Sequence, residues 1–143
     1  MKTSDITIAS LLAAVIWADG EYSEVERENL GEIAEALGIQ EKALNMNVTA
    51  ALGELKDLDE QKATEFAVKH AQKVDDEETG EVFLSVIQLA LCDSVLTADE
   101  VHNIITIGEA LDIDRDDAVL MLCDLVKTEP ELEVSFSSDE EEE

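Results

Sequence analysis

The strongest restriction on the fold of this chain is an internal repeat. Residues 19–39 return without a gap as residues 93–113, which is 74 positions later. Eight of the 21 aligned positions are identical, too many for chance in a chain of 143 residues. The identical pairs are Asp19/Asp93, Glu26/Glu100, Asn29/Asn103, Ile33/Ile107, Glu35/Glu109, Ala36/Ala110, Leu37/Leu111 and Ile39/Ile113. We therefore expect two pseudo-symmetric repeats that contain the same local structure.

Apolar residues recur at helical spacing in both halves, and no segment alternates with period two for long enough to be a strand. The expected fold class is all-α, a compact bundle of about seven helices. The first helix is apolar nearly all round, so it is expected at the centre. The predicted helices run over Ser4–Ala18, from Ser23 to Gly38, over Gln40–Leu55, from the corner at Asp57 and Asp59 to Val74, over Glu81–Cys92, from Thr97, and from near Asp114 to before Pro130.

The repeat also suggests the domain organisation. Residues 1–130 form one expected helical domain, with repeat one at about 4–74, an acidic linker at 75–80 and repeat two at about 79–127. Residues 131–143 end in a run of acidic side chains and are expected to be a disordered tail. The apolar run 6–18 is too short to span a bilayer, and its counterpart 86–92 lies mid-chain, so it is expected to be a core helix.

The charge of the chain limits its partners. Nine basic residues against 36 acidic ones give a formal charge of −27. Such a surface repels nucleic acid phosphates and anionic lipid, so we expect no nucleic acid partner and no membrane insertion. Cations, stress-response proteins and basic protein surfaces are the expected partners, although acidity also serves solubility or adaptation to a salty cytoplasm. The oligomeric state stays open, a homodimer included.

Each repeat places an aspartate at a helix-to-helix corner and a glutamate seven residues later, as Asp19 with Glu26 and Asp93 with Glu100. If the halves pack about a pseudo-twofold axis, the two corners face one another and these four carboxylates converge, with Glu21 nearby. Carboxylates held close together recruit a hard cation. Oxygen-only ligands indicate Ca²⁺, Mg²⁺ or Mn²⁺ rather than zinc. The sequence therefore predicts a divalent-cation site at these five residues.

A purely structural interpretation stands beside the metal site. Glu26 and Glu100 follow Ser23 and Thr97 by three residues, which is the spacing of a capping box. A helix start alone explains both glutamates, and the two aspartates then only end the preceding helices. Calcium loops of the EF-hand type are excluded, because stretches starting at residues 19 and 112 lack the glycine at position six and the glutamate at position twelve.

The histidines show no catalytic arrangement. His70 shares a helical face with Phe66, which predicts packing or a core hydrogen bond. His102 lies in the first turn of a helix, close to Glu100, where a role as a metal ligand is an alternative to a purely structural one. No serine or cysteine nucleophile is paired with a histidine, and the chain has no glycine-rich phosphate loop. We expect no enzymatic activity.

The remaining distinctive side chains are expected in the core. Cys92 and Cys123 lie in apolar runs, so both are predicted to be buried and reduced, as in a cytosolic protein. Trp17 precedes the first corner and is predicted to be a core anchor rather than a ligand platform.

The first corner resembles the TerB family, a tellurite-resistance-associated domain also seen in DjlA-type co-chaperones. The family's hallmark is a helix, an ADG-type corner, a few polar residues and a glutamate that opens the next helix. The matching residues are Ala18, Asp19, Gly20, Glu21, Ser23 and Glu26, then ALGI at 36–39, with Asp93, Thr97, Glu100 and ALDI at 110–113 in the second copy. The resemblance covers about residues 4–127.

The resemblance implies an all-helical, internally duplicated fold of about seven helices. It also implies an acidic cluster suspected of divalent-metal binding and a role in bacterial tellurite or chemical-stress response. Ser94 and Val95 depart from the pattern, which makes the first corner the better candidate. Tellurite is an anion that this charged surface would repel, so the implied role is indirect.

Together these features predict a cytoplasmic, non-enzymatic TerB-like stress-response module that binds a divalent cation at the repeated corner. The alternative is an acidic protein–protein interaction module that docks a basic partner without metal.

Overall fold

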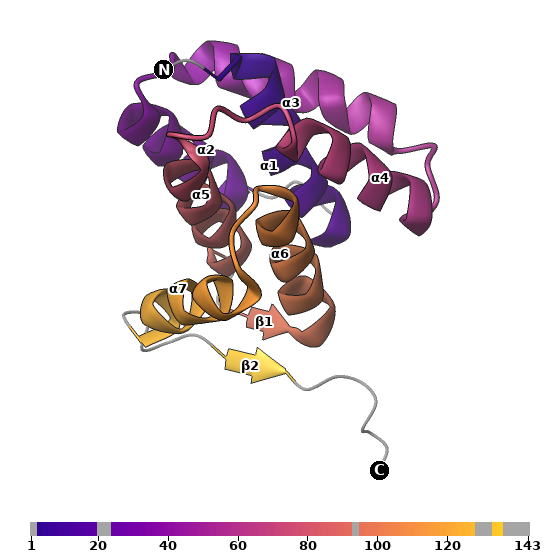
Figure 1. The fold of residues 1–143 in the computed structure, drawn as a ribbon. Helices are drawn as coiled ribbons and strands as arrows, with labels where there is room; N and C mark the ends of the chain where they lie inside the picture. The colour runs from indigo at the N-terminus through magenta and orange to yellow at the C-terminus, as the bar shows by residue number, and fades with distance from the viewer. Residues whose placement is uncertain (1–2, 20–23, 93–94, 128–132, 136–143) are drawn as a thin grey trace.

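The chain folds into a bundle of helices (Figure 1). The structure, a computed structural model, describes residues 3–19, 24–92, 95–127 and 133–135. Within these residues the expected all-α class is confirmed, with seven helices and two strands of three residues. The elements are α1 (Asp5–Asp19), α2 (Glu24–Leu37), α3 (Glu41–Leu55), α4 (Glu60–Ala71), α5 (Thr79–Leu91), β1 (Val95–Thr97), α6 (Ala98–Ala110), α7 (Arg115–Lys127) and β2 (Glu133–Ser135).

Three helices of the first half begin at the same spacing as three of the second half. The starts of α1 and α5, of α2 and α6, and of α3 and α7 are each separated by the interval of the sequence repeat. The starts of these helices therefore recur at the repeat interval beyond the aligned segments 19–39 and 93–113. α4 has no helical counterpart in the described part of the second half. That the halves are related by a symmetry axis stays a prediction.

The C-terminal ends of α2 and α6 also match. Gly38 has a φ of 74° and Asp112 a φ of 67°, so both lie in the left-handed region that ends a helix. The main-chain N–H of Ile39 donates to the carbonyl of Ala34 at 2.8 Å, and that of Ile113 donates to Gly108 at 3.0 Å. Both helices therefore end in the same hydrogen-bonded loop, and the predicted C-cap at Gly38 is confirmed.

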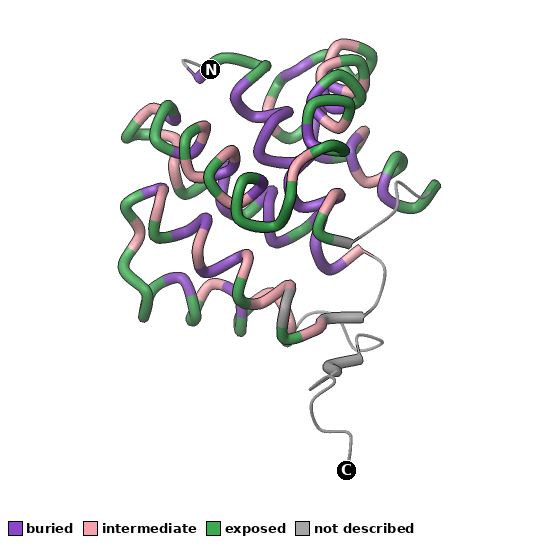
Figure 2. Tube along the Cα trace, turned by 90° about the vertical axis from the view of Figure 1, so that its right-hand side faces the viewer, coloured by how far each residue is buried: buried purple, intermediate pink, exposed green. Residues whose placement is uncertain are grey.

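α1 is the central helix, as its nearly all-round apolar sequence predicts. It packs against α3, α4, α5 and α6. In Figure 2 its buried residues lie inside the bundle, whereas exposed residues occupy the outer faces of the surrounding helices. The buried apolar residues of α1 are Ile8, Ala9, Leu11, Leu12, Ala13, Ala14, Val15 and Ile16.

The start of the chain is tied to the predicted linker. The main-chain N–H of Thr3 donates to Glu78 Oε1 at 2.8 Å, and the Thr3 hydroxyl donates to the same oxygen. The main-chain N–H of Asp75 in turn donates to the Thr3 hydroxyl oxygen at 3.0 Å. The connection lies earlier in the chain than expected, because α4 already ends at Ala71 and α5 begins at Thr79. The hydrogen bonds of Thr3 therefore hold the N-terminal end of α1 against the connection between the halves.

Two features depart from the sequence predictions. β1 and β2 pair in parallel, with Val95 opposite Glu133, although no strand was expected and β2 falls in the predicted tail 131–143. Strands of three residues are too short to show period-two alternation. Residues 136–143 lie outside the described residues. Among the described helices, none is long and apolar enough to cross a membrane.

Cys123 is exposed on α7, so the prediction that both cysteines are buried was wrong for it. The buried residues of α7 are Ala118 and Leu122, and Cys123 is turned away from this narrow stripe. Cys92 is half-buried, and neither cysteine forms a disulfide.

Candidate functional site

The helix that leads into each corner, α1 or α5, ends beside a helix of the other half of the chain. We call these two contacts the crossings. Two pockets, of about 290 and 300 Å³, mark these crossings. The α1–α6 pocket is lined by Ala14, Trp17, Ala18, Glu60, Ala63, Thr64, His102 and Asn103. The α5–α2 pocket is lined by Val25, Glu28, Asn29, Glu32, Gln88, Leu91 and Cys92. Thus the end of α1 lies beside the first turns of α6, and the end of α5 lies beside the first turns of α2.

The two pockets occupy equivalent places in the repeat. Five lining positions of the α1–α6 pocket have a counterpart, one repeat interval away, in the lining of the α5–α2 pocket. These pairs are Ala14/Gln88, Trp17/Leu91, Ala18/Cys92, Glu28/His102 and Asn29/Asn103. The α1–α6 pocket has an additional wall from α4, which contacts both α1 and α6. The crossings are therefore alike in position and different in chemistry.

Of the five predicted metal ligands, two have a described side chain. Asp19 is the last residue of α1, and its side chain lies outside the described residues, as do Glu21 and Asp93 entirely. Glu26, in the first turn of α2, is only 3% exposed. Glu100, in the first turn of α6, is half-buried. The described residues therefore leave the convergence of all five untested.

Glu100 performs the capping role that its spacing predicts. Its Oε1 accepts a hydrogen bond from the main-chain N–H of Thr97 at 3.0 Å. The Thr97 hydroxyl oxygen accepts one from the main-chain N–H of Glu100 at 3.2 Å. The second predicted capping box is thus confirmed. Its counterpart includes Ser23, which lies outside the described residues.

In the described part of the chain, no group of three or more histidine, cysteine, aspartate or glutamate side chains could hold a metal ion. One oxygen of Glu100 is also already used at the helix cap. The donor set at the corners consists of carboxylates, which suits hard divalent cations. The cation site accordingly stays a prediction, with Asp19, Glu21 and Asp93 as the residues that would have to complete it.

The sequence prediction missed Glu60, Thr64 and Asn103 as pocket residues. Glu60 and Thr64 belong to α4, which lies outside the repeated segment, so no internal comparison pointed to them. Asn103 did carry a signal, because it is identical to Asn29 in the other half and both line pockets. Trp17 packs against the core, as predicted, and its half-buried side chain also lines the α1–α6 pocket.

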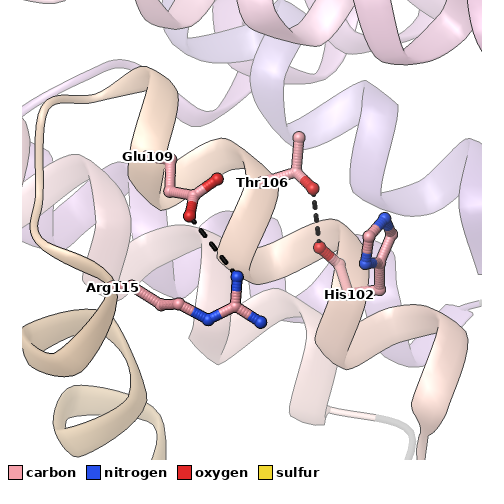
Figure 3. Close-up of polar contacts among 4 residues, drawn as sticks. All are labelled: His102, Thr106, Glu109 and Arg115. Carbon is pink, nitrogen blue, oxygen red and sulfur yellow. Dashed lines mark hydrogen bonds and ion pairs between the residues drawn. The ribbon is translucent and has the colours of Figure 1, made fainter.

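His102 is exposed on α6 and lines the α1–α6 pocket. Its main-chain carbonyl accepts a hydrogen bond from the Thr106 hydroxyl at 2.9 Å, one turn farther along (Figure 3). The same view shows the ion pair between Glu109 and Arg115, with 3.6 Å between Oε2 and the guanidinium Nη1, which joins the end of α6 to the start of α7. Both partners of this pair are well exposed, so it contributes little to stability.

Two buried polar atoms lack a hydrogen-bond partner among the described residues: Asn29 Oδ1 and His70 Nδ1. His70 packs against Phe66, with 4.6 Å between ring centroids, so its predicted packing role is confirmed. Burial lowers the pKa of the His70 imidazole, and the nearby Lys73 and Lys69 lower it further, while Glu54 acts in the opposite direction. Folding therefore favours the neutral ring over the protonated one, relative to the unfolded chain.

The family model described as Tellurite resistance protein TerB matches residues 5–122. The chain belongs to the TerB family. This match covers all of the helices from α1 through most of α7, including both corners and both pockets. The resemblance seen at the ADG corner is thereby confirmed. Comparisons with curated proteins and with solved structures found no significant match.

Proposed function

We propose that this TerB-family chain is a non-enzymatic module that binds a divalent cation at its two corners and acts in tellurite resistance or a related stress response. The ligands would be Asp19, Glu21 and Glu26 from the first corner, with Asp93 and Glu100 from the second. Ca²⁺, Mg²⁺ and Mn²⁺ are the candidate ions, since all five donors are carboxylates. Repulsion between tellurite and a chain of charge −27 supports an indirect role.

The observation that carries this proposal is the crossing of the helix ends. Ala18, next to Asp19 in the chain, shares a pocket with residues from the start of α6, the helix that holds Glu100. Cys92, next to Asp93 in the chain, shares a pocket with Val25, next to Glu26 on α2. In both corners, the residue that precedes the aspartate therefore lies beside a helix of the other half. That helix is the one that holds the glutamate of the other corner. This arrangement supports convergence of the two corners.

The burial of Glu26 gives additional support. A carboxylate that is 3% exposed needs hydrogen bonds, an ion pair or a metal ion to offset its loss of hydration. Its place in the first turn of α2 adds the favourable end of the helix dipole. A cation held by Glu26 would be shielded from water at the first corner.

Isothermal titration calorimetry with Ca²⁺, Mg²⁺ and Mn²⁺ tests the site. We expect the wild-type chain to bind one of these ions and the double variant Asp19→Asn/Asp93→Asn to lose that binding. The control is Asp57→Asn/Asp76→Asn, which removes the same charge from exposed positions outside both corner segments and should bind normally. Equal heats for the wild-type chain and the corner variant would rule out the proposed ligands.

A second candidate function is docking of a basic protein partner through the acidic surface, without metal. The observation that favours it is the formal charge of −27. Such docking is weakened by salt, because exposed charges are screened. Pull-down of partners that is lost at high salt and unaffected by chelator would support docking, whereas loss with chelator alone would support the cation site.

A further inference from the structure

We propose that the α1–α6 pocket binds the guanidinium side chain of an arginine presented by a basic partner segment. This inference rests on the docking function above and names its anchor. None of the five corner carboxylates lines this pocket. The pocket is built from three helices that are distant in the sequence, since α1, α4 and α6 each provide part of its lining.

The shape and size of the pocket suit one long side chain. Its volume of about 290 Å³ lies at the lower end of the range for ligand sites, which excludes a large cofactor. Alanines from α1 and α4 form part of its lining, so little side-chain bulk narrows it at those positions. These alanines are Ala14, Ala18 and Ala63.

The polar residues of the pocket supply acceptors rather than positive charge. Glu60, the first residue of α4, is exposed, and its carboxylate forms no hydrogen bond or ion pair with another described residue. Asn103 adds an amide oxygen, and His102 adds an imidazole ring to the lining. A group with several N–H donors and a positive charge matches this set.

Trp17 favours arginine over lysine. Its half-buried indole lines the same pocket as Glu60. A guanidinium is planar, stacks on aromatic faces and presents two N–H groups to one carboxylate. An ammonium group is compact and strongly hydrated, so it gains less from the same surroundings.

The equivalent pocket in the other half lacks these features. Leu91 replaces Trp17 there, and no counterpart of α4 exists in the described residues. Glu28 takes the place of His102, so that pocket is acidic but has no aromatic wall. The two crossings therefore provide a comparison within one molecule: both attract cations, and one has the groups to orient a guanidinium.

The test uses acetylated and amidated Gly-Arg-Gly, with Gly-Lys-Gly and Gly-citrulline-Gly as matched peptides, at low salt and in the presence of chelator. Trp17 is the sole tryptophan, so its fluorescence reports directly on the pocket. We expect the arginine peptide to change the emission and to bind more tightly than the lysine peptide. Citrulline keeps the shape of arginine without its charge and should not bind.

Two variants separate the pocket from the general negative charge. Glu60→Gln should weaken arginine-peptide binding about tenfold, because it removes one charge-assisted contact. Glu28→Gln removes the same charge at the equivalent crossing and should leave the affinity within about twofold. Trp17→Leu, which copies the other half, should also weaken binding, measured by calorimetry, with circular dichroism to check folding.

Equal weakening by Glu60→Gln and Glu28→Gln would overturn the pocket while leaving docking intact, since total charge alone would then govern binding. Equal affinity for the arginine and lysine peptides would overturn the stacking argument. If none of the peptides binds the wild-type chain, the pocket proposal fails, whereas docking is decided separately by the pull-down of basic partners.

Discussion

The ring of Phe83 on α5 lies against Gly108 on α6 so closely that a Cβ added to the glycine would come within 3.0 Å of Phe83 Cζ. On α7, the Cβ of Ala118 would lie 3.3 Å from the same added atom. Phe83 is fully buried, so it cannot move aside into solvent. The three helices of the second half therefore pack together at a point that has no room for a side chain on Gly108.

Gly108→Ala should destabilise the chain by about 1–3 kcal/mol, as overpacking of a rigid core does. Gly53→Ala is the matched control, because Gly53 also lies inside a helix and an added Cβ there meets no atom within 4 Å. The control should stabilise by roughly 0.5–1 kcal/mol through helix propensity. Urea denaturation measures both, and equal effects of the two substitutions would contradict the tight contact.

The C-terminal ends of α2 and α6 each contain a left-handed residue, Gly38 and Asp112, and substitutions at these two positions should change stability in opposite directions. Gly38→Ala should destabilise by about 1 kcal/mol, because alanine resists a φ near 74°. Asp112→Gly should stabilise by roughly 0.5–1 kcal/mol, because it relieves an L-residue held at a φ of 67°. Thermal unfolding of both variants beside the wild-type chain checks the signs, and stabilisation by Gly38→Ala would refute the assignment.

Loss of the helix cap at Thr97 should be measurable. Thr97→Ala should cost about 0.5–2 kcal/mol, the usual range for a lost N-cap. The substitution removes the acceptor for the main-chain N–H of Glu100, whereas Thr97→Ser keeps the hydroxyl and should be nearly neutral.

The same pair of variants tests whether the helix cap at Thr97 and the cation site are coupled. If Glu100 is a ligand, loss of the cap should also weaken cation binding in calorimetry, whereas Thr97→Ser should bind as the wild-type chain does.

His70 should make stability depend on pH. Burial holds the pKa of its imidazole below the ordinary value of 6.5, so the unfolded chain takes up a proton before the folded chain does. The contribution is complete above pH 6.5 and is lost as the pH falls through the lowered pKa. We compare the unfolding free energies of the wild-type chain and of His70→Gln across this window. The value for the wild-type chain should fall relative to that of the variant as the pH becomes more acidic.

The large acidic charge affects both of those proteins alike, so the difference between them isolates His70. NMR titration of the imidazole provides a direct check. A His70 pKa at or above 6.5 in the folded chain would contradict the predicted direction.

Local features of this chain were predictable from its sequence because they depend on neighbouring residues. Sequence signals within one or two helical turns predict three of them: the capping box at Thr97 and Glu100, the helix end at Gly38 and the central place of α1. The repeat interval extended those signals to the starts of three helix pairs.

Features that depend on packing between distant segments were not predictable. The wall that α4 adds to the α1–α6 pocket arises from contact between helices far apart in the chain, which leaves no pattern in the sequence. The exposure of Cys123 reflects how narrow a stripe α7 buries, and its apolar neighbours did not reveal that. Three-residue strands fall below the length at which alternation can be read.

α4 belongs to the first half by sequence, yet it packs against α6 of the second half as well as against α1. α1 itself rests on α5 and α6. A fragment ending at residue 74 would keep α3 and α4 on the central helix but would lose α5 and α6, so the apolar surface that those two helices cover would be open to self-association. Each half of the chain thus completes the interior of the other, so we expect neither half to keep its full core when produced alone.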